Sequence, residues 1–239
     1  MQSRPRHSRI RRQDLESSAA AGLAPGSTEI ELGVPIPGVI LPKEQWARTA
    51  LKKLPESGML DWAELFGRVA PIILDLGCGN GRFVVGSAIR RPAYNHLGID
   101  ILPVVIRYAT RRANQRGLHH VRFAVVSAAE FLERHVPRGT VRELHVYHPQ
   151  PYAGSQTSRR LLNDRFFFLA CQALEAGGKL FLQSDHAGYW KELLVAGKER
   201  FSLKIQEAPW PDDELGRTRR EILSRARGKP IFRAIGYPR

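Results

Sequence analysis

The pattern of apolar and polar residues changes at Pro71. From there onward, short apolar runs alternate with stretches in which apolar residues recur at helical spacing. The apolar runs predict strands at 72–76, 95–100, 121–126, 142–148, 179–184, 201–207 and 230–237. The stretches between them predict helices at 81–91, 101–116, 128–135, 159–174 and 189–197. This alternation predicts an α/β fold with a doubly wound, mostly parallel seven-stranded sheet and helices on both faces.

Proline and glycine mark several boundaries of these elements. Pro103 fits the first turn of its helix, and Gly177 and Gly178 are expected to stop the helix over 159–174. The segment 149–158 is rich in loop-forming residues and predicts a loop. Ligands of such sheets bind beyond the carboxyl ends of the strands, so functional residues are expected there.

The N-terminal part lacks this regular alternation. Residues 1–28 are basic at first and show no apolar periodicity, so we expect a disordered tail followed by a single domain over 29–239. Three prolines between 35 and 42 predict an extended entry segment. Short helices are expected at 44–54 and 60–67.

Composition narrows the class of protein. A chain of 239 residues that is 43% hydrophobic can bury one large core without disulfides. Cys78 and Cys171 are the two cysteines, which excludes a disulfide scaffold and fits a cytoplasmic location. No apolar run approaches the ~18 residues of a membrane span, and no apolar stretch follows the N-terminal arginines as in a secretory signal. The histidines lack metal-ligand spacing, so no metal is expected.

The net charge of +14 is concentrated at the two ends. Residues 1–12 carry five arginines and no acid, whereas residues 217–239 carry seven arginines, one lysine and one acid. A nearly neutral body with basic ends favours a polyanionic partner such as nucleic acid. The alternative is a chain that is merely rich in arginine at flexible ends.

The most informative segment is Asp75-Leu76-Gly77-Cys78-Gly79-Asn80-Gly81, which joins the first predicted strand to the first helix. Its glycines permit positive φ and close approach of a ligand. A dinucleotide fingerprint needs a small residue at Arg82, and a P-loop needs a Gly-Lys-Ser/Thr ending, so neither motif fits. The spacing resembles motif I of class I S-adenosylmethionine (AdoMet) methyltransferases.

Two acids accompany this loop. Asp100 ends the second predicted strand, where a carboxylate can accept both ribose hydroxyl protons, although Asp is also a good N-cap for the following helix. Asp75 is expected either to hold the methionine ammonium of AdoMet or to brace the glycine turn.

From about Leu60 onward, the sequence resembles the bacterial tRNA (guanine-N7-)-methyltransferase family. The motifs that carry the resemblance are LDWAELFGRVAP, DLGCGNGRF, the GID ending at Asp100, PQPY at 149–152 with Arg159-Arg160, Ser184-Asp185, and TRRE at 218–221. The resemblance implies a Rossmann-like class I methyltransferase fold, AdoMet as cofactor, and transfer of its methyl group to N7 of a guanine in the variable loop of tRNA. For the oligomeric state, we expect either a monomer or a homodimer.

The resemblance also assigns site residues. The cofactor-binding set is Asp75, Gly77, Gly79, Gly81, Asp100 and Ser127, where Ser127 replaces a family acid near the adenine. The catalytic candidates are Gln150, which replaces the Asp of the family's PDPW, and Asp185. The substrate-binding set is Tyr152, Arg159, Arg160, Asp185, Thr218 and Glu221.

Several of these residues also have a structural interpretation. Asp185 precedes a predicted helix that it could cap, and Thr218 with Glu221 matches a capping box. Arg159 and Arg160 suit phosphate contacts, or else a solvated helix start. Tyr152 suits stacking on an unpaired base.

The departures from the family pattern keep two other functions open. With Gln150 and the rewritten segment AGSQTS, the chain would suit a methyltransferase of the same fold that acts on another substrate. A catalytically weak RNA-binding protein is the third possibility, although it would not need the intact glycine loop and Asp100.

Overall fold

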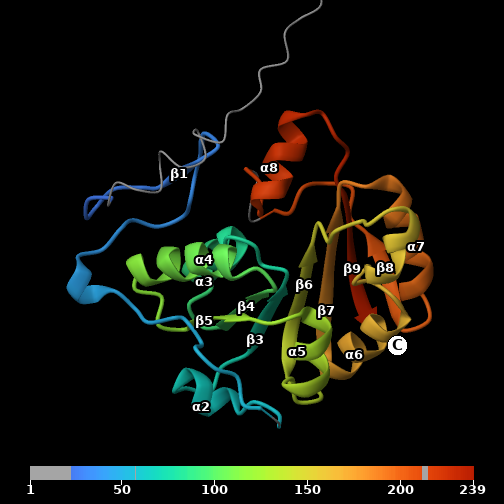
Figure 1. The fold of residues 1–239 in the computed structure, drawn as a ribbon, viewed down its shortest axis with the longest axis horizontal. Helices are drawn as coiled ribbons and strands as arrows, with labels where there is room; N and C mark the ends of the chain where they lie inside the picture. Colours follow the sequence, from blue (N-terminus) through green and yellow to red (C-terminus); the bar gives the residue numbers. More distant parts are fainter. Residues whose placement is uncertain (1–22, 57, 212–214) are drawn as a thin grey trace, which may run out of the picture.

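The computed structural model describes residues 23–56, 58–211 and 215–239, and it shows an α/β sandwich (Figure 1). Seven strands form the central sheet in the order β5-β4-β3-β6-β7-β9-β8. Their bounds are β3 Ile72–Leu76, β4 Asn95–Asp100, β5 Val121–Val125, β6 Val141–Tyr147, β7 Leu174–Ser184, β8 Phe201–Ile205 and β9 Phe232–Pro238. The five strands from β5 to β7 are parallel, whereas β9 is antiparallel to both of its neighbours. The predicted fold class is therefore confirmed.

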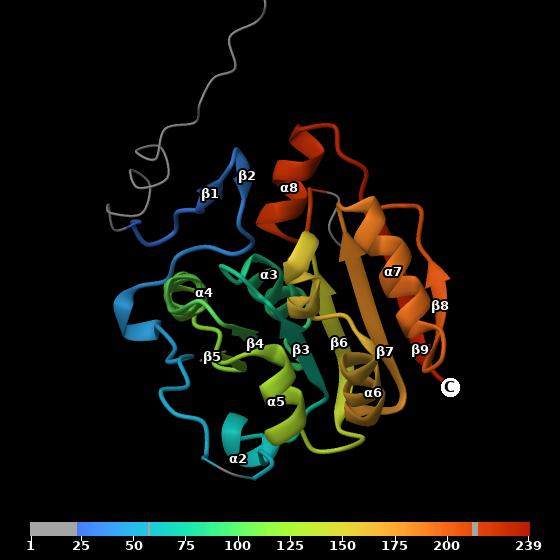
Figure 2. The same ribbon diagram turned by 45° about the vertical axis from the view of Figure 1, so that its right-hand side comes forward.

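Helices cover both faces of the sheet, as Figure 2 shows. One face carries α3 (Arg82–Arg90) and α4 (Pro103–Gln115), and the other carries α5 (Ala128–Arg134), α6 (Asp164–Ala173) and α7 (Ala187–Gly197). Successive side chains of β3 point to opposite faces of the sheet. Ile72, Leu74 and Leu76 therefore join the larger core cluster, whereas Ile73 joins the cluster beneath α3 and α4. Burial of both faces explains why the parallel strands read as continuous apolar runs.

The connections from β3 and β6 leave the sheet toward opposite faces, one to α3 and the other to α6. These two strands are neighbours, with Asp75 opposite His145 in parallel register. Their carboxyl ends therefore frame the crevice in which doubly wound sheets bind ligands.

The N-terminal segment differs from its prediction. A two-stranded hairpin of β1 (Ile30–Glu31) and β2 (Val34–Pro35) was not predicted, and the helix expected at 44–54 is wrong. Only Lys43–Gln45 forms a 3-10 turn, after which the chain runs along β5: Leu51 N–H donates to the Phe123 carbonyl, and Phe123 N–H donates to the Thr49 carbonyl. The open edge of the sheet thus takes up backbone groups that a helix would have paired internally.

The expected tail ends earlier than residue 28 among the described residues. Gly26 N–H donates to the Ile40 carbonyl, and Ile40 N–H donates to the Ser27 carbonyl. The part of this prediction that falls on residues 1–22 lies outside the described residues.

Two helix boundaries need correction, and one helix was missed. The helix expected from residue 159 begins at Asp164, capped by Asn163, and a 3-10 turn over Gly154–Arg159 precedes it. It ends at Ala173 rather than at the glycines, because Leu174 already pairs with Val141 in the sheet. The missed helix is α8 (Arg219–Ala226), whereas a short α2 (Trp62–Phe66) lies where one was expected.

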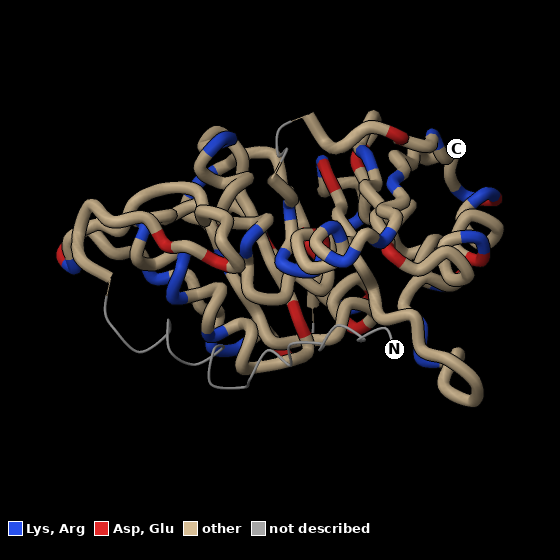
Figure 3. Tube along the Cα trace, turned by 90° about the horizontal axis from the view of Figure 1, so that it is seen from above, with Lys and Arg blue, Asp and Glu red and all other residues tan. Residues whose placement is uncertain are grey.

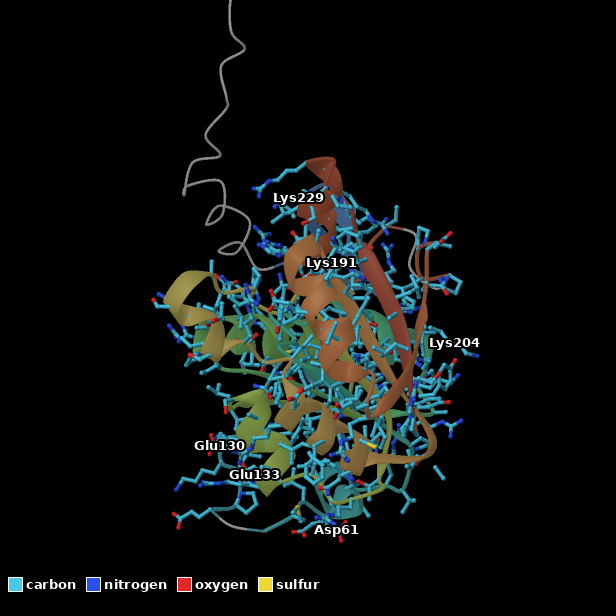
Figure 4. All side chains as sticks on the ribbon, turned by 90° about the vertical axis from the view of Figure 1, so that its right-hand side faces the viewer. Asp61, Glu130, Glu133, Lys191, Lys204 and Lys229 are labelled. Carbon is cyan, nitrogen blue, oxygen red and sulfur yellow. The ribbon has the colours of Figure 1, made fainter. Side chains whose placement is uncertain are left out.

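Helix α8 lies beyond the carboxyl ends of β6 and β7 (Figure 1). Figure 3 looks onto this end and shows basic positions gathered over the middle of the molecule, where α8 lies. Figure 4 shows Lys229 at this end, whereas Asp61, Glu130 and Glu133 lie at the opposite end. No helix in the described part of the chain has the length and apolar character needed to cross a membrane.

Two glycines of the β3–α3 loop offer a matched pair for testing the packing of this region. A Cβ on Gly81 would lie 2.7 Å from the Cβ of Ala109 on α4, whereas a Cβ on Gly79 would meet no atom of the other described residues within 4 Å. Both residues have positive φ, at +76° and +54°. We expect Gly81→Ala to lower the free energy of unfolding by about 2–4 kcal/mol, since overpacking adds to backbone strain. Gly79→Ala should cost only about 1–2 kcal/mol, from backbone strain alone. Urea unfolding of both variants measures the difference, and equal losses would contradict the packing argument.

Candidate active site

The loop between β3 and α3 has the backbone of a ligand cradle. Gly77, Gly79 and Gly81 have φ values of +82°, +54° and +76°. The N–H groups of Gly77 and Cys78 both donate to the Ile99 carbonyl at 2.9 Å, which ties the loop to β4. Apart from the adjacent residues, no atom of the described part of the chain lies within 4 Å of a Cβ on Gly77 or Gly79, so a ligand can approach the backbone there. Gly81 instead packs against α4 and serves the fold.

This loop borders a pocket of about 590 Å³. Three further walls come from α4, from α8 with the residue before it, and from the β1–β2 hairpin. The polar residues of its lining include Glu31, Asp75, Asn80, Arg82, His148 and Thr218. Among the predicted site residues, Asp75, Gly77, Gly79 and Thr218 line the pocket, and the others lie outside its lining.

Asp75 is a buried acid of this pocket, with 2% of its surface exposed. Burial, reinforced by the negative charge of Asp100, raises the pKa of Asp75 to about 8, although Arg217 acts in the opposite direction. The ligand-free carboxyl is therefore mostly protonated at neutral pH. A cationic ligand group would favour its ionised form.

Asp100 holds the glycine loop to the start of α4. One carboxylate oxygen accepts the N–H of Gly79 at 3.0 Å, and the other accepts the N–H of Leu102 at 2.9 Å. The N-cap of α4 is Leu102, so the alternative of Asp100 as an N-cap is wrong. Ser127 is the N-cap of α5, where its hydroxyl accepts the N–H of Glu130.

The segment 149–152 follows β6 and carries the substrate candidates. Gln150 is exposed. The Arg160 guanidinium donates to the carbonyls of Pro151 and Tyr152, pairs with Glu192 and lies 4.9 Å from the Tyr189 ring centre. Arg160 thus fixes this segment from within the protein.

Arg159 is placed differently. Its guanidinium lies 4.8 Å from the centre of the Tyr152 ring, and its side chain is exposed. This arrangement leaves an exposed cation stacked on an aromatic ring beside the strand end.

Asp185, at the end of β7, is bound by protein partners on both sides. It accepts hydrogen bonds from Ser224 at 2.6 Å and Arg220 at 3.0 Å, both on α8, and it contacts His148 Nδ1 at 3.3 Å. The hydrogen bond from His148, with those from Ser224 and Arg220, holds the pKa of Asp185 well below its usual range despite burial. The N-cap of α7 is His186, so the capping alternative for Asp185 is wrong.

Thr218 and Glu221 form the start of α8. The Thr218 hydroxyl accepts the N–H of Glu221, as in a capping box, and Thr218 also lines the pocket. Glu221 is fully buried, and its carboxylate accepts hydrogen bonds from Arg225, Arg233 and the backbone N–H of Arg217. Burial opposes ionisation, but these hydrogen bonds and one from Gln183 lower the pKa of Glu221. Its carboxylate therefore stabilises the packing of α8 on β9.

His148 is a pocket residue to which the sequence analysis assigned no role. Its φ is +52°, in the left-handed region that favours glycine. The Trp210 indole N–H donates to the Oε1 of Gln183 at 2.6 Å, which leaves the Gln183 amide nitrogen to donate to Nε2 of His148 at 2.8 Å. The imidazole proton then sits on Nδ1 and points to Asp185. This network holds the backbone where β6 turns into the segment 149–152.

Metal ligation finds no support in residues 23–56, 58–211 and 215–239. They contain no group of three or more His, Cys, Asp or Glu side chains placed to hold a metal ion. The absence of a metal remains a prediction.

Comparison with known proteins places the chain in a family. A family model described as "Putative methyltransferase" matches residues 69–234. The chain belongs to this methyltransferase family. Helices α3 to α8 and the whole central sheet lie within the matched residues, apart from the last residues of β9.

Several curated relatives share the name tRNA (guanine-N(7)-)-methyltransferase. The relative from Halorhodospira halophila is 32% identical over 142 residues, which cover 59% of this chain and 62% of that protein. The relative from Thermus thermophilus is 31% identical over 172 residues, covering 72% and 55%, and that from Nocardia farcinica is 29% identical over 187 residues, covering 76% and 70%. The chain thus spans less than two thirds of the length of the first two relatives. The family match and these relatives confirm the family resemblance predicted from the motifs.

Solved structures share the fold at low identity. A 30S ribosomal A1408 methyltransferase from an uncultured bacterium superposes with a TM-score of 0.52 at 13% identity, covering 80% of this chain and 98% of that one. A predicted O-methyltransferase from Agrobacterium tumefaciens gives 0.50 at 18% identity, covering 75% and 81%.

The raised pKa of Asp75 has a consequence for stability. Between about pH 4 and pH 8 the folded chain keeps a proton that the unfolded chain has released, so this group lowers the free energy of unfolding as pH rises through that window. Asp75→Asn mimics the protonated acid and removes the effect. We expect the stability advantage of the variant over the wild type to be larger at pH 8.5 than at pH 5 by about 4 kcal/mol, since over roughly three pH units of that interval the folded acid keeps its proton and each unit contributes about 1.4 kcal/mol. Urea unfolding at both pH values measures this, and an equal difference at both would argue against a buried acid with a raised pKa.

Proposed function

We propose that this protein transfers the methyl group of AdoMet to N7 of a guanine in tRNA, in the cytoplasm. The observation that carries the proposal is the shared name of the curated relatives, at 29–32% identity, together with the open glycine cradle in the same chain. The basic C-terminal region gives independent support, because a polyanionic substrate suits it.

The pocket fits AdoMet at its glycine end. The open space beside Gly77 and Gly79 admits a ligand against the backbone, and a buried acid, Asp75, lies at the same place. In this proposal Asp75 takes the ammonium of the methionine end and Thr218 contacts that end from α8. Asp100 keeps the loop in shape and faces the ribose, and Ser127 lies toward the adenine.

When bound, AdoMet supplies an electrophilic methyl group on a sulfonium. Guanine N7 carries an in-plane lone pair and no proton, so the protein needs no general base. The residues around the pocket have to align the two reactants, which by itself can be worth several kcal/mol.

The substrate side begins where β6 ends. Tyr152 and Arg159 offer a stacked aromatic and cationic pair for an unpaired base and its phosphate. Gln150 provides an amide acceptor for the guanine edge without a negative charge. Asp185 acts as a positioning residue, since its carboxylate joins His148 to α8.

A second candidate is a methyltransferase of the same fold that acts on another substrate. Gln150 favours it, because the segment PQPY carries no carboxylate to stabilise a developing cation on guanine. Arg160 also favours the second candidate. Its guanidinium binds the carbonyls of Pro151 and Tyr152, so one expected contact with a tRNA phosphate is lost.

Nucleoside analysis of tRNA incubated with the protein and AdoMet tests the proposal directly. We expect N7-methylguanosine in the digested tRNA, and none in the absence of AdoMet. AdoMet binding without any methylated guanine would favour another substrate, and no AdoMet binding would favour an RNA-binding protein without activity.

The charge lost at Gln150 can be restored. If the protein methylates guanine N7, Gln150→Asp should raise the single-turnover rate about tenfold or more, because one added charge-assisted contact is worth about 1.5–3 kcal/mol. Gln150→Glu is the control, since it adds the same charge on a longer side chain. If the protein serves another substrate, the amide donor is needed and the substitution should lower activity. Rapid guanine methylation by the wild type that slows in Gln150→Asp would contradict the charge argument.

A further inference from the structure

The β1–β2 hairpin precedes residue 69, where the match to the family model begins. It nevertheless forms a wall of the pocket, through Glu29, Ile30, Glu31 and Leu32. A segment outside the matched region thus completes the site whose floor lies inside that region.

Glu31 fixes the hairpin in this position. One of its carboxylate oxygens, Oε1, accepts hydrogen bonds from Asn80 Nδ2 at 2.6 Å and from Arg112 Nη2 at 3.1 Å. The same oxygen lies 3.5 Å from Arg219 Nη1. Glu31 therefore touches the glycine loop, α4 and α8, which are the other three walls of the pocket.

The second carboxylate oxygen of Glu31, Oε2, has no hydrogen-bond donor among the described residues. The side chain is 6% exposed, and Oε2 lies 3.8 Å from Arg82 Nη1. A buried carboxylate oxygen without a hydrogen-bond donor is costly. Since Glu31 lines the pocket, a donor group on a bound ligand can supply the missing hydrogen bond.

The lining indicates which end of the cofactor reaches this oxygen. Asp75, Gly77 and Thr218 line the pocket, whereas Asp100 and Ser127, on the ribose and adenine side of the proposed arrangement, do not. The pocket is thus the methionine end of the site. The ammonium is the only hydrogen-bond donor at that end, because the sulfonium and the carboxylate carry no proton.

We propose that Glu31 binds the α-ammonium of the cofactor's methionine end through Oε2, and thereby makes the hairpin part of the cofactor site. An ammonium has three N–H donors, so Glu31 and Asp75 can share it. The inference rests on AdoMet as the proposed cofactor. It adds a carboxylate that the motifs of the family region do not contain.

The test compares two ligands on the full-length protein by calorimetry. S-adenosylhomocysteine carries the ammonium, and 5′-methylthioadenosine lacks the amino-acid end altogether. Glu31→Gln should weaken S-adenosylhomocysteine about tenfold and change methylthioadenosine by less than about twofold, since only one ligand loses a charge-assisted contact.

Glu29→Gln is the matched control. Glu29 pairs with Arg112 and Arg116 in the same cluster, and each of its carboxylate oxygens already accepts a hydrogen bond. Loosening the hairpin in this way should change both affinities by the same factor. If Glu31→Gln does not fold, as judged by its thermal transition, Glu31→Asp replaces it, because withdrawing the carboxylate should also penalise only the ligand with the ammonium.

Two results for the Glu31 variant would overturn the inference. One is that both ligands lose affinity by the same factor, and the other is that S-adenosylhomocysteine loses no affinity. Failure of the proposed cofactor itself is distinguishable, because the wild-type protein would then bind neither ligand.

Discussion

The site depends on one interaction, the hydrogen bonds that Asp100 makes with the backbone of Gly79 and Leu102. A loop with three positive-φ glycines has little conformational preference of its own, so something outside it must choose its shape. The Asp100 carboxylate does so by joining the loop to the end of β4 and the start of α4. Because β3 lies at the switch point of the sheet, the loop so fixed opens into the crevice. Asp75 is buried beside it, and this burial raises the pKa of Asp75.

Most of the sheet could be predicted from the sequence because its strands are specified locally. The runs at 72–76 and 95–100 are buried on both faces, and their predicted bounds coincide with β3 and β4. The hairpin and the segment along β5 could not be predicted, since their partners are remote. Glu31 is held by residues of α4 and α8, and Leu51 by the edge of β5. The spacing of apolar residues in the local sequence carries no information about such contacts.

The same distinction separates the site residues. The sequence placed Asp75, Gly77 and Gly79 in the pocket because the loop carries its own signal. It did not reveal that Arg160 binds the carbonyl of Pro151 or that Glu221 binds Arg233 of β9, because those partners come from other segments of the chain. The positive φ of His148 had no signal at all, since glycine or asparagine would be expected there. Assigning a charged residue to a substrate from its motif therefore needs a check of its partners in the fold.

In the proposed function, a buried and protonated Asp75 becomes the counter-ion of the cofactor's ammonium. Calorimetry of AdoMet binding at pH 7, in two buffers with different enthalpies of ionisation, tests it most directly. With a pKa of about 8 in the free protein, Asp75 must lose its proton as the ammonium arrives, so we expect release of about one proton per bound cofactor. Binding by Asp75→Asn should release none. Tight AdoMet binding by the wild-type protein without proton release would contradict the account.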